Sequence, residues 1–106
     1  MSNEELMKHL RGVQYIVINK CYGGFGLSER AEREYKAMAG ITDPNFYDRD
    51  IPRDDPYLVK LVRELGMAAN GVHANLSIVE VPPDVEWQIE EYDGNEWVAE
   101  KHRTWS

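Results

Sequence analysis

The chain has 106 residues, of which 42% are hydrophobic and 29% are charged, so it is typical of one globular domain over residues 1–106 and not of disordered or fibrous proteins. Its formal net charge of -7 argues against direct binding to nucleic acid or to anionic membranes and favours basic partners. The single cysteine excludes an internal disulfide, and the sequence shows no signal-type segment and no long apolar run. We therefore expect a cytoplasmic protein.

We expect a short helical lead-in over residues 1–12, in which Leu6 and Leu10 are spaced to contact the body of the domain once. The stretch Val13–Tyr22 then carries apolar residues at both alternating sets of positions, which predicts a central strand. A helix is expected over Ser28–Ala39, because apolar residues recur at helical spacing between a serine cap and a glycine stop.

Between this strand and this helix lies a loop that contains Gly23, Gly24 and Gly26. We call it the glycine loop and interpret it as the organising turn of the domain. At least one of its glycines is expected at positive φ, since a tight turn needs that freedom. Amides before a helix also favour anions, which makes the loop a candidate ligand site. The alternative is that the glycines serve turn geometry alone, and their spacing matches no phosphate-binding fingerprint. The candidate ligand-binding residues are Lys20, Cys21, Gly23, Gly24, Gly26, Ser28 and, near the C-terminus, Arg103.

A long charged loop over residues 41–56 follows, with three prolines and the run DRDIPRDDP. Long loops are often functional, although this one also supplies Asp54 and Asp55 as caps for the next helix. That helix is expected over Pro56–Ala69, because one stripe of leucine and valine runs along it and Asn70-Gly71 gives a stop signal.

Three strands are expected after the helices, over Ala74–Val81, Val85–Glu91 and Glu96–Trp105. The order β-α-α-β-β-β predicts an α+β domain in which two main helices cover one face of a small, four-stranded, mostly antiparallel sheet. Such a sheet leaves two edges, so a homodimer formed through the last strand is an open alternative to a monomer.

The register of the last hairpin depends on the turn at Asp93-Gly94. A two-residue turn would place Val98 opposite Ile89, whereas a three-residue turn with a bulge would place Trp97 there. We favour the bulge, because burying an indole gains more free energy than burying a valine.

A protein partner would meet the acidic hairpin and the charged loop. The residues expected in this contact are Asp48, Arg49, Asp50, Arg53, Glu90, Glu96 and Glu100. The cluster Lys101–Trp105 is the one cationic and aromatic cluster in an acidic chain. It is expected either to recognise phosphate or to serve as an interface hot spot, and the alternative is that it pairs with Glu86 and closes the core.

Evidence for catalysis in the sequence is limited to one pair. Cys21 and His102, with Glu100 as an orienting acid, would suit thiol chemistry, but a lone cysteine at a strand end is more often a buried hydrophobe. The three histidines share no ligand spacing, so we expect no metal and no cofactor. We therefore favour a binding protein over an enzyme.

The segments KCYGGFGLS, IPRDDP and VEWQIEEYDGNEWVAEKHRTW resemble a group of small uncharacterised proteins of phages, other viruses and some bacteria. This resemblance implies a phage-type accessory protein that acts on a host protein or a host defence component through its acidic surface, in the host cytoplasm. The alternatives are a binder or sequestering protein for a nucleotide or another phosphate-bearing ligand at the glycine loop, and a cysteine-based enzyme.

Overall fold

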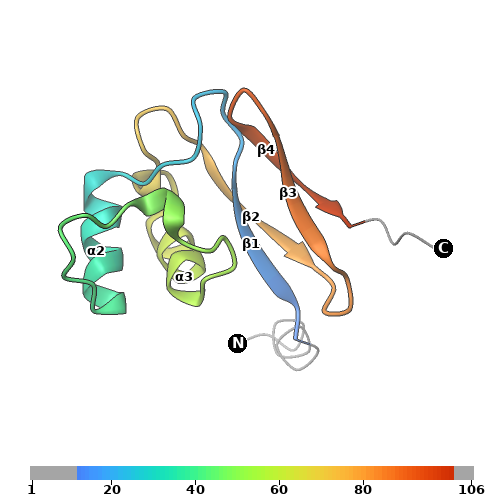
Figure 1. The fold of residues 1–106 in the computed structure, drawn as a ribbon, viewed down its shortest axis with the longest axis horizontal. Coiled ribbons are helices and arrows are strands. Elements are labelled where there is room, and N and C mark those ends of the chain that lie inside the picture. The colour runs from blue at the N-terminus through green and yellow to red at the C-terminus, as the bar shows by residue number, and fades with distance from the viewer. Residues whose placement is uncertain (1–11, 102–106) are drawn as a thin grey trace.

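The computed structural model describes residues 12–101, so the lead-in expected over residues 1–12 lies outside the described residues except for Gly12, and Arg103 lies outside them too. Figure 1 shows the helices on one side of a strand pair and a hairpin on the other. The α+β class is confirmed. The elements, in chain order, are β1 (Gln14–Asn19), α2 (Glu29–Ala39), η1 (Asp48–Asp50), α3 (Pro56–Leu65), η2 (Gly66–Ala69), β2 (Leu76–Val81), β3 (Trp87–Tyr92) and β4 (Asn95–Glu100).

Helix α2 begins and ends where its capping residues lie. The Ser28 side chain accepts a hydrogen bond from the Ala31 amide at 3.1 Å, which satisfies one free N–H of the first turn. Gly40 ends the helix in the left-handed region, with φ of 69°, and its N–H donates to the carbonyl of Lys36. Both caps confirm the sequence prediction.

Helix α3 is shorter than expected. Asp55 caps its N-terminus by accepting from the amides of Tyr57 and Leu58, and Pro56 occupies the first turn. The α-helix ends at Leu65 because Gly66 has φ of 56° and ψ of -128°, values that no α-helix continues through. Residues to Ala69 follow as the 3₁₀ turn η2 instead of α-helix.

The four strands form two antiparallel pairs, β1–β2 and β3–β4, instead of the single sheet that we expected. The outward edge of β1 explains why β4 does not join it as a third strand. The Val17 amide donates to the carbonyl of Arg53 at 2.8 Å, and the Asn19 amide donates to the Glu96 carboxylate at 2.8 Å. Both amides that β4 would need are thus already bonded.

The β1–β2 pair is the central layer, and its two faces pack on different cores. Val17 lies in the larger core with the helices, where Leu58 and Ala31 are fully buried. Ile16 and Ile18 lie in a smaller core with the inner face of the hairpin. Burial on both faces explains the continuous apolar run in this strand. The hairpin is also tied to β1 by the Trp87 indole, which donates to the side chain of Gln14 at 2.9 Å.

Between α2 and α3, the Tyr35 ring stacks on Phe46 and its hydroxyl donates to Asp55 at 3.1 Å. Burial and, secondarily, the bond to this carboxylate raise the pKa of Tyr35 to about 12. The bond joins the N-terminal cap of α3 to α2, so the cap serves packing between the two helices as well as helix initiation.

The hairpin has the two-residue turn, so the bulge that we favoured is wrong. Ile89 pairs with Val98, and Asp93 and Gly94 have φ of 49° and 89°. Positive φ at both central residues is the type I′ geometry that Asp-Gly favours, because its twist matches that of the strands. The twist preference outweighs burial of the indole, and Trp97 therefore lies on the outer face, opposite Glu90.

Candidate functional site

The glycine loop has the geometry expected of an organising turn. Gly24 has φ of 93°, which confirms that at least one of the loop glycines lies at positive φ. Gly23 is needed for space, because a Cβ on it would lie 2.1 Å from the Cβ of His73. A Cβ on Gly94 would lie 2.4 Å from the Gly24 nitrogen, so the hairpin tip also packs on this loop. These close approaches support the geometric interpretation of the glycines.

Several amides that an anion site would use are bonded within the fold. The Leu27 amide donates to the carboxylate of Asp48 at 2.9 Å, and the Ser28 amide donates to the carbonyl of Ala69. Ser28 is also committed through its hydroxyl, which caps α2 and donates to the carbonyl of Ala68. Gly26 accepts from the Gly71 amide. An anion at this helix start would have to displace the Asp48 carboxylate.

Lys20 and Cys21 lie at the end of β1, beside the same loop. The lysine is exposed and the cysteine is half-buried. The Cys21 carbonyl accepts a hydrogen bond from the Asn19 side chain at 2.7 Å. In this arrangement Cys21 contributes its backbone to the fold, and its thiol has no described histidine partner, because His102 lies outside residues 12–101.

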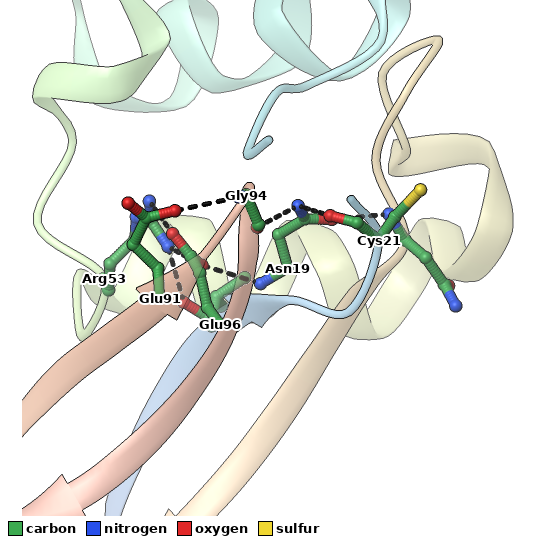
Figure 2. Close-up of polar contacts among 8 residues, drawn as sticks. Asn19, Cys21, Arg53, Glu91, Gly94 and Glu96 are labelled. Atoms are coloured by element: carbon green, nitrogen blue, oxygen red, sulfur yellow. Dashed lines mark hydrogen bonds and ion pairs between the residues drawn. The ribbon is translucent and has the colours of Figure 1, made fainter. Parts of the chain in front are cut away.

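A buried polar cluster joins β1, the hairpin and the charged loop (Figure 2). Asn19 is fully buried, and its side-chain amide donates to the carbonyls of Cys21 and Gly94 at 2.7 Å each while its oxygen accepts from the Asn75 amide. Its backbone N–H donates to Glu96, which is 7% exposed. We call Asn19, Arg53, Gly94 and Glu96 the polar lock. Both amide protons of the Asn19 side chain are used, so the lock fixes the hairpin tip in one position.

Arg53 pairs with Glu96 through two parallel bonds, with Nη1 to Oε1 at 2.5 Å and Nη2 to Oε2 at 2.9 Å. Its guanidinium also lies 3.7 Å from the centroid of the Phe25 ring. The arginine and glutamate side chains are only 17% and 9% exposed. Two residues expected to contact a partner therefore use their charges within the fold, and no sequence pattern pairs positions so far apart.

The other residues expected in the partner contact divide into two groups. Asp48 is half-buried and bonded to the Leu27 amide, whereas Arg49 and Asp50 are exposed on η1. Arg49 also lines a pocket of about 270 Å³ beside the polar lock. Glu90 and Glu100 are exposed on the hairpin. The structure thus leaves exposed charges on both segments that the sequence analysis selected.

The outer face of the hairpin carries a set of side chains that sequence reasoning did not assemble. Since Trp87, Ile89 and Val98 pack inward, alternation along the strands places their neighbours outward. We call these residues the outer hairpin face; they are Gln88, Glu90, Tyr92, Asn95, Trp97 and Ala99. Tyr92 is 67% exposed and Trp97 is 39% exposed. The Asp93-Gly94 pair favours a two-residue turn and therefore predicts this register, whereas burial of the indole favours the other one.

Three of these side chains hold one another in place. The Trp97 indole N–H donates to Glu90 Oε2 at 3.1 Å, and the Gln88 amide donates to Glu90 Oε1 at 3.2 Å. Tyr92 lies on the same face, diagonal to Trp97 across the strands. Aromatic side chains at such diagonal positions are within reach of each other. The face therefore presents two aromatic rings beside a carboxylate.

Within residues 12–101, no group of three or more histidine, cysteine, aspartate or glutamate side chains is arranged to hold a metal ion. In the same range, no helix is long and apolar enough to span a bilayer. No protein-family model, curated protein or solved structure matches the chain. The resemblance to phage-associated proteins stays a prediction.

Proposed function

We propose that the protein is a binding module that engages a basic protein partner through the outer hairpin face. The observation that carries this proposal is the half-exposed Trp97, whose indole is fixed by a bond to Glu90. Tryptophan and tyrosine are the residues most enriched at interface hot spots, because a rigid ring gives a large contact area at a small cost in entropy.

The charge around the face indicates which partner fits. The exposed acidic side chains of the hairpin and the residues just before it are Asp84, Glu86, Glu90, Glu91, Asp93 and Glu100. Of those on the strands, the register places Glu90 on the outer face beside Trp97, and Glu91 and Glu100 on the other face. In a chain of net charge -7, this clustering favours a partner whose contact surface is rich in arginine or lysine. A guanidinium stacked on Trp97 would also lie beside the Glu90 carboxylate, which combines cation–π and ionic attraction.

The proposal keeps the hairpin as the contact expected from sequence but changes which of its residues touch the partner. Glu96 and Arg53 are assigned to the polar lock, while Tyr92 and Trp97 replace them as anchors. Following the resemblance noted above, the partner that we propose is a host protein. We favour protein binding over anion binding at the glycine loop, because the Leu27 and Ser28 amides already have acceptors.

A comparative capture experiment tests this function. The full chain and two variants, Trp97→Ala and Tyr57→Ala, are immobilised and exposed to host lysate at low and high salt. Tyr57 is the matched control, because it is an aromatic of similar exposure (46%) on α3, in the helical layer. We expect a basic protein to be captured by the wild type and by Tyr57→Ala at low salt, and to be lost in Trp97→Ala and at high salt. Equal capture by both variants would contradict the proposal.

A further inference from the structure

The outward edge of β1 is closed at one end and open at the other. The backbone N–H and C=O groups at alternate positions of β1 bond to β2. The backbone groups of Tyr15, Val17 and Asn19 therefore point to the opposite edge of β1, away from β2. The Val17 and Asn19 amides are bonded to Arg53 and Glu96, as described above. The Tyr15 amide has no such acceptor in the described part of the chain. Unpaired edge groups are the usual template for adding a strand.

A groove of about 360 Å³ lies beside this open edge, between the start of β1 and one side of α3. Its apolar lining comes from Val13, Tyr15, Pro56 and Val59. This volume suits a few side chains of an extended segment. The groove lies on the helical side of β1, where Tyr15 packs, so it is separate from the outer hairpin face.

Two cations, Lys60 and Arg63, lie one helical turn apart on the α3 side of the groove. The Arg63 guanidinium lies 4.9 Å from the centroid of the Tyr15 ring, which places it close to the open edge. Neither cation forms an ion pair in the described residues. Asp54 and Glu64 also line the groove, so its charge is mixed along its length.

We propose that this groove binds an extended peptide segment of another protein, which adds to β1 as a short strand. The peptide backbone pairs with the open edge at Tyr15, an apolar side chain packs on Pro56 and Val59, and an acidic side chain meets Lys60 and Arg63. Strand addition of this kind takes affinity from main-chain bonds and specificity from side-chain pockets. The site is distinct from the proposed contact for a basic partner and does not depend on it.

Amide hydrogen exchange and peptide selection on the full chain test the site. In the peptide-free protein, the Tyr15 amide is expected to exchange rapidly, whereas the Val17 and Asn19 amides are protected. Random octapeptides displayed on phage are then selected on the full chain. Selected peptides are expected to combine an acidic residue with β-branched neighbours and to protect the Tyr15 amide when bound.

Charge reversal locates the binding. The double variant Lys60→Glu/Arg63→Glu should weaken the selected peptides by at least about tenfold. The matched control is Arg30→Glu/Arg33→Glu, which changes two exposed arginines at the same spacing on α2 and should leave binding unchanged. Three results would overturn the proposal: no selected peptide sensitive to the α3 reversal, Tyr15 protected in the peptide-free monomer by the chain itself, or protection that appears only with dimerisation.

Discussion

Replacing Glu96 with alanine tests whether the polar lock holds the hairpin in place. The substitution leaves the Arg53 guanidinium, whose side chain is 17% exposed, without its carboxylate partner. It also leaves the buried backbone N–H of Asn19 without an acceptor. Removing one partner of a buried ion pair costs about 3–5 kcal/mol, and an unpaired amide adds about 1–3 kcal/mol. The partial exposure of the Arg53 side chain reduces the first of these costs, so we expect a loss of about 3 kcal/mol in the free energy of unfolding.

Urea unfolding followed by circular dichroism measures this loss, with Glu100→Ala as the matched control. Glu100 is an exposed glutamate on the same strand, and its removal should change stability by no more than about 0.5 kcal/mol. The double variant Arg53→Ala/Glu96→Ala should lose at least about 1 kcal/mol less than the sum of the two single losses, because the residues contact each other. A loss below about 1 kcal/mol for Glu96→Ala, or strict additivity in the cycle, would refute the lock.

Two further predictions concern the turn and the helix pair. Gly24→Val should lower the free energy of unfolding by about 1 kcal/mol or more, because Gly24 has φ of 93°. Gly26→Ala should be tolerated, since the nearest atom to its added Cβ is 4.0 Å away. Lys20→Ala should leave the urea midpoint nearly unchanged. Tyr35, with a pKa of about 12, keeps its proton in the folded state when the unfolded chain has lost it, so stability should fall by roughly 2–3 kcal/mol between pH 10 and 12 relative to Tyr35→Phe. Equal slopes for the two proteins in this pH range would rule out the Tyr35 assignment.

Local signals in the sequence predicted the parts of the fold that depend on neighbouring residues. The Ser28 and Asp55 caps, the Gly40 stop and the positive φ in the glycine loop all follow from rules that act within a few residues. The division of the strands into two sheets does not follow from such local rules. It depends on Arg53, which contacts β1 from a loop far away in the sequence.

The candidate site was predicted only in part, because it too depends on contacts between residues far apart in the sequence. The acidic hairpin was evident from its composition, but which side chains face outward depends on a turn whose register we misjudged. Charge alone also does not distinguish a free carboxylate, such as Glu90, from one that is paired in the interior, such as Glu96. That difference is set by tertiary contacts, which a single sequence leaves open.

Site-specific photo-crosslinking tests the proposed partner contact most directly. A photoreactive phenylalanine analogue is placed at Tyr92 on the outer hairpin face or, as a control, at Tyr57 on α3, and each full-length protein is irradiated in host lysate. Both positions are exposed aromatics, so the substitution perturbs the fold equally little. We expect one basic protein to be crosslinked from position 92, to be absent from position 57 and to disappear when Trp97→Ala is added. Crosslinking of the same protein from position 57 alone, or from position 92 regardless of Trp97, would contradict the account.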